Sequence, residues 1–130
     1  MAIVFGVFAL LGIANGLWML LAPASWYLHL PAGVPDTGPF NHHFVQDIGA
    51  AFLTLGIAFA VATARPASRR GVALAGALFM TLHAVVHLVD LLAGRLHARH
   101  WTLDLPGVFL PAIVLLVLCL PRWWRSPQGG

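Results

Sequence analysis

The chain has 130 residues, of which 60% are hydrophobic and only 8% are charged, and its formal net charge is +3. A water-soluble domain exposes more charge than this, so the composition indicates an integral membrane protein. The seven basic residues other than histidine are all Arg, and they lie in short loops and tails rather than in an extended basic stripe. Nucleic acid is therefore not expected as a partner. The single cysteine, Cys119, excludes an internal disulfide and a thiolate metal cluster.

Four apolar segments follow one another along the chain, at residues 3–22, 42–64, 71–94 and 103–120. Each has about the length that a helix needs to cross a hydrocarbon core of ~30 Å. The first has no basic residue before it and is followed by three more, which favours a membrane span over a cleaved signal peptide. We predict an all-α fold with a single transmembrane domain over residues 1–130, arranged as a four-helix bundle of two antiparallel hairpins.

Small residues and helix-breaking residues suggest how the first two spans pack and connect. Gly12 and Gly16 lie four residues apart, a spacing that lets another helix approach closely, and Gly49 of the second span is expected beside a polar pocket. Residues 25–41 are predicted to form an ordered loop without helix because they contain three prolines, Pro31, Pro35 and Pro39. Asn41 is a suitable N-cap for the second span.

The distribution of Arg predicts the orientation of the chain in the membrane. The loop after the second span and the C-terminal tail hold five Arg residues (Arg65, Arg69, Arg70, Arg122 and Arg125), whereas the other side holds Arg95 and Arg99. Because cytoplasmic loops are enriched in basic residues, we predict that both termini are cytoplasmic. The expected partners are the lipid bilayer and either further copies of the chain or a larger membrane complex.

Two stripes of ionisable residues interrupt the apolar spans. His83, His87 and Asp90 have the spacing i, i+4, i+7 and share one face of the third span, and His43 and Asp47 share a face of the second. Ionisable groups at membrane depth normally face the protein interior and mark a functional site. Aligning the two antiparallel helices at about 1.5 Å per residue places His43 level with Asp90 and Asp47 level with His87. Two reciprocal His–Asp pairs are therefore predicted.

The sharpest hypothesis for this pocket is a metal site. Imidazole and carboxylate ligands from facing helices suit zinc, iron, copper or manganese. The predicted ligands are His43, Asp47, His83, His87 and Asp90, and the metal would serve redox chemistry, metal handling or structure.

Three alternatives remain open at this point. The polar cluster could be architectural, fixing helix register in a bundle that contacts lipid or another subunit. One His from each of two helices could ligate haem b, with the small residues 49–51 leaving room for the macrocycle. A His–Asp pair could instead act as general acid and base on a lipid-soluble substrate. The sequence leaves enzymatic activity undecided.

Other polar residues have simpler interpretations. Asp36, in Pro-Asp-Thr-Gly, is predicted to be a turn residue. His97 and His100 are predicted to be solvated or interfacial residues of a short outer loop. Asp104 is a candidate cap for the fourth span, where Pro111 is expected to bend the helix.

One stretch of the second span resembles a known type of membrane protein. Asn41-His-His-Phe-Val-Gln-Asp-Ile-Gly49, followed by Leu53-Thr-Leu-Gly56, is similar to the opening of the second span in small bacterial four-helix proteins of the DoxX-like type. There, a polar or charged residue followed by Gly often opens that span. The resemblance implies a multi-pass bundle in the inner (plasma) membrane. The His-rich third span departs from the pattern of these proteins, and no catalytic residue is carried over.

Overall fold

The computed structural model describes residues 1–124, which are mostly helical and contain no strand. Three helices are long and apolar enough to cross a membrane: α1 (Ala2–Leu21), α3 (His42–Ala64), and α4 (Arg69–Leu92) together with the preceding η2 (Pro66–Ser68). A shorter apolar helix over Leu105–Leu118 combines η3 (Leu105–Phe109) and α6 (Leu110–Leu118). Arg125 and the tail from residue 126 lie outside the described residues.

Short helices lie between the long ones and after the last of them. These are α2 (Pro23–His29), η1 (Val34–Thr37), α5 (His100–Leu103) and η4 (Pro121–Trp123). The prediction of a helix-free loop over residues 25–41 was therefore wrong. Proline is compatible with a first helical turn, so α2 starts at Pro23, and it ends before Pro31. The Tyr27 hydroxyl donates to the carbonyl oxygen of Gly38 at 2.7 Å and ties the remaining loop to α2.

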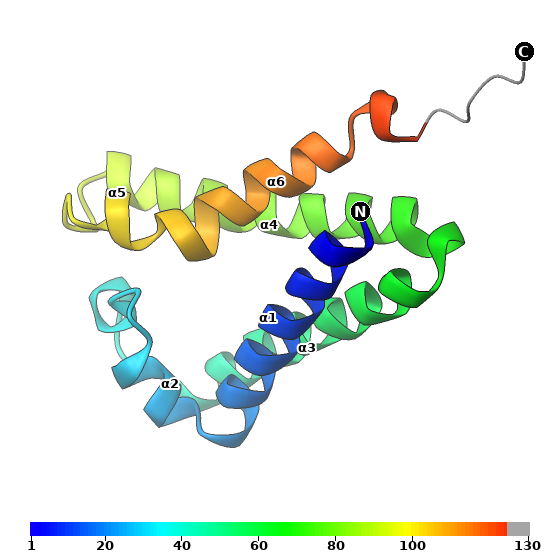
Figure 1. The fold of residues 1–130 in the computed structure, drawn as a ribbon. Coiled ribbons are helices and arrows are strands. Elements are labelled where there is room, and N and C mark those ends of the chain that lie inside the picture. The colour runs from blue at the N-terminus through cyan, green and yellow to red at the C-terminus, as the bar shows by residue number, and fades with distance from the viewer. Residues whose placement is uncertain (125–130) are drawn as a thin grey trace, which may run out of the picture.

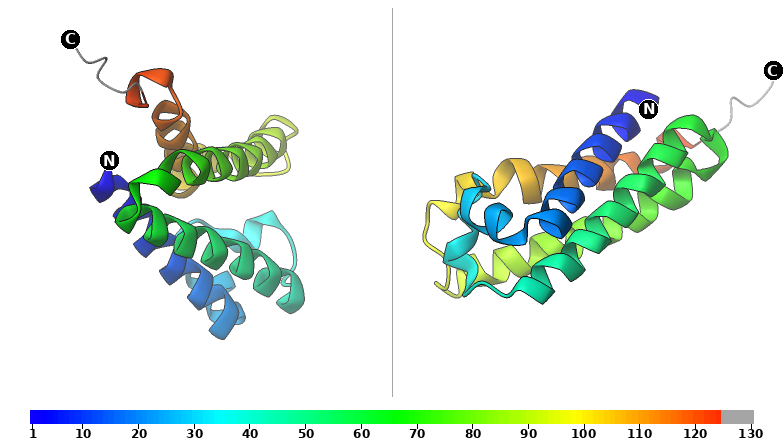
Figure 2. Two further views of the ribbon diagram at one scale, coloured as in Figure 1. Left: turned by 90° about the vertical axis from the view of Figure 1, so that its right-hand side faces the viewer. Right: turned by 90° about the horizontal axis from the view of Figure 1, so that it is seen from below.

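The long helices form two pairs, α1 with α3 and α4 with α6 (Figure 1). The pairs converge near η2 and splay apart toward the opposite end, as Figure 1 and the left view of Figure 2 show. The convergent end holds the apolar core, to which all four helices contribute: Phe5, Ala9, Phe59, Ala62, Ala73, Ala77, Met80, Ala112, Leu115 and Leu118. Arg69 reinforces this end, because its guanidinium donates to the carbonyl oxygens of Ala62 and Thr63 at the end of α3.

Glycines let α1 and α3 approach each other at the backbone. A Cβ atom at Gly16 would lie 2.5 Å from the Leu53 nitrogen, and one at Gly56 would lie 2.5 Å from the Ile13 nitrogen. The predicted close approach at Gly12 and Gly16 is thus confirmed, with Gly49 and Gly56 as the facing residues. Gly49 packs against Met19 of α1, whereas we expected it beside a polar pocket. Asn41 caps α3 as predicted, accepting from the Phe44 nitrogen at 3.1 Å.

We predict that Gly16→Ala and Gly56→Ala destabilise the protein by about 1–3 kcal/mol each, because the added methyl group meets backbone atoms that cannot move aside. The matched control is Gly71→Ala in α4, where an added Cβ has nothing within 4 Å. Thermal unfolding in detergent measures the difference. Equal melting temperatures for all three variants would contradict the observed α1–α3 contact.

Candidate functional site

The splay of the two helix pairs separates the two predicted stripes. His43 and Asp47 lie near the start of α3, at the splayed end, and pair with each other, with 3.3 Å between Nε2 and Oδ2. Their side chains are 87% and 63% exposed. Within the described residues, neither forms an ion pair or hydrogen bond with α4. The predicted His43–Asp90 and Asp47–His87 pairs are therefore wrong, because the alignment assumed that α3 and α4 run side by side over their whole length.

The α4 stripe divides among different partners. His87 donates from Nδ1 to an Asp104 oxygen at 2.8 Å, whereas Asp90 pairs with Arg95 at 2.7 Å. His83 lies next to His87, with 4.8 Å between ring centroids. Its own ring stacks on Phe79 and meets the edge of Phe52 from α3. Of the predicted site residues, the structure thus brings together His83 with His87 and, separately, His43 with Asp47.

Asp104 forms the centre of a different cluster. Its carboxylate is 1% exposed and has a histidine on each oxygen: Nδ1 of His87 lies 2.8 Å from Oδ2, and Nδ1 of His100 lies 3.2 Å from Oδ1. A buried carboxylate is costly unless donors surround it. The two imidazole N–H groups meet that requirement.

A change in helix geometry positions Asp104. The segment from Leu105 to Phe109 is a π-helix, and the Asp104 carbonyl oxygen accepts from the nitrogens of both Val108 and Phe109. The wider turn lies just before Pro111, which lacks the N–H that would bond the carbonyl four residues earlier. The helix thus accommodates Pro111 by widening, and single π turns are frequent at functional sites. Because η3 packs against α4, Asp104 at its start lies beside His87.

His100 connects Asp104 to the loop between α2 and α3. It is fully buried, and its Nε2 lies 3.0 Å from Oδ2 of Asp36, which also pairs with Arg99. The prediction of a solvated or interfacial His100 was therefore wrong. Both ring nitrogens of His100 face carboxylate oxygens, and an ionised carboxylate only accepts hydrogen bonds. Both nitrogens must then carry a proton, so His100 is an imidazolium.

The charges in this cluster reinforce one another. Burial lowers the pKa of His100, but the hydrogen bonds with Asp36 and Asp104 raise it by more, and the net shift is upward from its ordinary value. Hydrogen bonds from Arg99 and then from His100 hold the pKa of Asp36 below its ordinary value. Arg99 and His100 carry positive charge opposite Asp36 and Asp104, so the cluster is balanced.

The remaining nitrogen of His87 is accessible. Because Asp104 accepts from Nδ1, a neutral His87 carries its lone pair on Nε2. The His87 side chain is 17% exposed, and its Nε2 forms no hydrogen bond within the described residues. An oriented, accessible base is therefore present near the end of α4.

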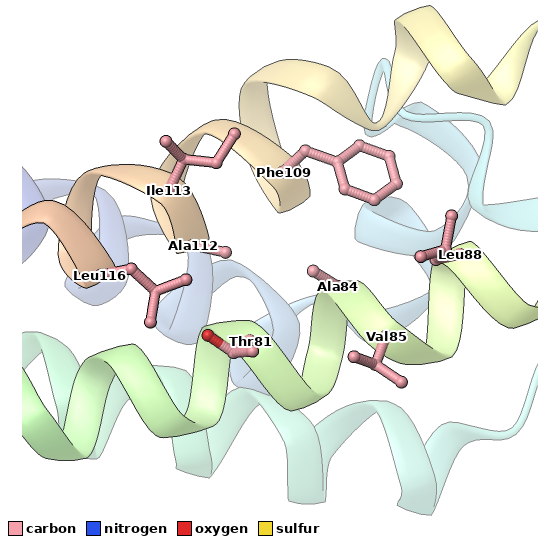
Figure 3. Close-up of a pocket in the computed structure, with 8 residues that line it drawn as sticks. All are labelled: Thr81, Ala84, Val85, Leu88, Phe109, Ala112, Ile113 and Leu116. Carbon is pink, nitrogen blue, oxygen red and sulfur yellow. The ribbon is translucent and has the colours of Figure 1, made fainter.

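An apolar pocket of about 190 Å³ lies on a different face of α4 (Figure 3). Residues of α4, η3 and α6 line it: Thr81 and Ala84 of α4 lie opposite Ala112 and Leu116 of α6, and Thr81 is the one polar lining residue. It contains none of the histidines. The acid–base cluster and this pocket are separate features.

Within residues 1–124, no group of three or more His, Cys, Asp or Glu side chains is arranged to hold one metal ion. The donors form a chain rather than a shell, since the nitrogens of His100 face two different carboxylates. The space that we expected for haem b at Gly49 is also occupied, because Gly49 packs against α1.

Sequence reasoning did not assign Asp36, Arg99 or His100 to the site. It treated Asp104 as a candidate cap that lies near the level of His43, and it did not include Asp104 among the ligands. His100 and Asp104 have the same i, i+4 spacing as His83 and His87, so this pair was detectable. Asp36 had no local signal, because its partners lie more than 60 residues away.

Comparisons with protein-family models, curated proteins and solved structures find no match. The DoxX-like resemblance therefore stays a prediction.

We predict that the His100 contacts make stability depend on pH. A group whose pKa is raised by folding stabilises fully below its ordinary value, 6.5 for His100, and loses this contribution as pH rises through the folded value. The melting temperature of wild type should exceed that of His100→Gln most at about pH 6, and the gap should narrow toward about pH 9.

The exposed His97 provides the matched control: His97→Gln should keep the pH dependence of wild type. A gap between the melting temperatures of wild type and His100→Gln that stays constant over this range would show that folding does not raise the pKa of His100.

Proposed function

We propose that this chain is an integral membrane protein with a proton-transfer centre, in which His87 acts as general base and acid on a lipid-soluble molecule. The observation that carries the proposal is the 2.8 Å hydrogen bond from Nδ1 of His87 to the buried Asp104 carboxylate. This bond leaves Nε2 as the reactive nitrogen. A carboxylate on the distal nitrogen orients an imidazole and stabilises the imidazolium that forms, the logic of catalytic triads.

The chemistry requires one proton movement in each direction. The lone pair of His87 Nε2 takes a proton from a C–H or O–H group, and the electron pair of that bond stays on the substrate. Asp104 stabilises the resulting imidazolium. The same nitrogen then returns the proton to another atom of the substrate or to water. A positioned general base of this kind contributes typically ~10²–10⁴-fold to a rate.

The surroundings of His87 favour an apolar substrate. It belongs to a helix that is apolar enough to cross a membrane, and the residues directly before and after it, Val86 and Leu88, have 59% and 37% exposed area. The neighbouring His83 adds a second imidazole flanked by Phe52 and Phe79. A charged substrate would have to lose its hydration to reach Nε2, which is costly.

The test uses nitrobenzisoxazole, an apolar probe of general bases. A base removes its ring C–H proton, the electron pair forms a nitrile, and the N–O bond breaks to give a coloured phenolate. We predict that wild-type protein in detergent opens this ring about 100-fold faster than His87→Gln, which lacks the basic nitrogen.

The control is His43→Gln, which removes an imidazole that is 87% exposed and should leave the rate unchanged. If wild type and His87→Gln react at the same rate while both are folded, the protein has no general base at His87.

Metal binding is a second candidate because His83 and His87 lie adjacent, with ring centroids 4.8 Å apart. Carboxylates on the distal nitrogen of metal-bound histidines are common, and Asp104 would fill that role. Such a site needs further ligands from another molecule or subunit. Elemental analysis of the purified protein decides: stoichiometric metal that is lost in both His83→Ala and His87→Ala supports this candidate, and metal-free wild type removes it.

The orientation proposed for the chain has both termini in the cytoplasm of a bacterial cell, and its fourth helix completes four passages through the inner membrane. The asymmetry of Arg supports it, since Arg65, Arg69 and Arg70 lie at the η2 end. In a Cys119→Ser background, an impermeant thiol reagent added from outside should label Thr37→Cys and not Ala67→Cys. The reverse pattern would invert the proposed topology.

A further inference from the structure

The Asp104 carboxylate is held by more than His87. Asp36 comes from the loop between α2 and α3, in the first half of the chain, whereas His87, His100 and Asp104 belong to the second half. A continuous chain of hydrogen bonds joins these four residues: Asp36 Oδ2 to His100 Nε2 at 3.0 Å, His100 Nδ1 to Asp104 Oδ1 at 3.2 Å, and Asp104 Oδ2 to His87 Nδ1 at 2.8 Å. Asp36 is 22% exposed, and the two residues after it in this chain are sealed from solvent.

We propose that Asp36 is a positioning residue for the proton-transfer centre and acts on His87 through His100 and Asp104. This inference rests on the proposed function. Asp36 requires a proton on Nε2 of His100, which keeps His100 doubly protonated. The other N–H of His100 then fixes Oδ1 of Asp104, so that Oδ2 stays directed at His87. Without Asp36, a neutral His100 can turn its lone pair toward Asp104, and the carboxylate loses one of its two fixed donors.

The shape of the loop around Gly33 is a second observation in favour of this role. Gly33 has a φ of 67°, a conformation that side chains other than glycine rarely adopt. A Cβ there would lie 3.3 Å from Leu103 Cδ1 and 3.4 Å from His100 Cε1. The loop therefore lies directly against α5, and the bond from Tyr27 to Gly38 fixes its far side. Figure 1 shows this loop next to α5 at the end where the helix pairs splay apart.

This arrangement connects the two halves of the molecule at the site itself. The long helices converge at the η2 end, and the ion pairs of Asp36 with Arg99 and His100 join the halves at the other end. The orientation of the reactive nitrogen then depends on a residue that does not touch it.

The test compares Asp36→Asn, Asp36→Glu and the control Asp90→Asn in the full-length protein. Asp90 is also a carboxylate paired with an arginine at this end of the molecule, but its partner Arg95 lies outside the chain of bonds that leads to His87. Two readouts are measured: kcat and KM for nitrobenzisoxazole, and the titration midpoint of His100 from hydrogen–deuterium exchange at its ring carbon.

We expect Asp36→Asn to lower kcat at least about fivefold with KM unchanged, since it disturbs the orientation of the base without touching the substrate. The midpoint of His100 should fall in the same variant, a change that a merely structural role would not produce. Asp36→Glu should restore both readouts in part, and Asp90→Asn should match wild type. If Asp36→Asn does not fold, Asp36→Glu carries both readouts alone, with a smaller loss of kcat and a smaller fall in the midpoint of His100.

Two results overturn the proposal in distinguishable ways. If wild type exceeds His87→Gln but Asp36→Asn keeps the full kcat, the proton-transfer function stands and the positioning role of Asp36 is wrong. If wild type reacts no faster than His87→Gln, the proposed function fails, and the positioning role fails with it.

Discussion

The arrangement of this site depends on one buried carboxylate. Asp104 is 1% exposed in a protein with few charged residues, and an unpaired charge there would cost several kcal/mol. Its two oxygens are met by one imidazole each, and this requirement links three parts of the chain: α4 through His87, α5 through His100, and the α2–α3 loop through Asp36. The orientations of His87 and His100 follow from satisfying that one charge.

The geometry of the site depends on a difference between the two ends of the helix pairs. At the convergent end, small residues and an apolar core bring four helices together. At the splayed end, α3 lies away from α4 (Figure 1). The segment beside His87 is instead the π-helical turn that precedes Pro111. A sequence feature that disturbs a helix thus positions the central carboxylate. The Asp104 cluster lies at the splayed end, apart from the apolar core.

The sequence was sufficient for the helical class, for three long apolar helices and for the glycine contact of the first helix, because each depends on local pattern. It was also sufficient to mark His83 and His87 as neighbours on one face. The sequence did not predict the partners of His87, because the splay of the helix pairs is determined by packing and cannot be inferred from the spacing of residues along a helix. The role of Asp36 could not be predicted for a related reason, since only the folded loop brings Asp36 to His100.

The most direct test of the account is the protonation of His87 in the resting protein, observed by nitrogen NMR of histidine-labelled material in lipid. The neutral form of the ring should carry its proton on Nδ1 and its lone pair on Nε2, and this preference should be lost in Asp104→Asn, where the carboxylate is absent. A ring with the proton on Nε2, or the same tautomer preference in wild type and Asp104→Asn, would contradict the central role of the His87–Asp104 bond.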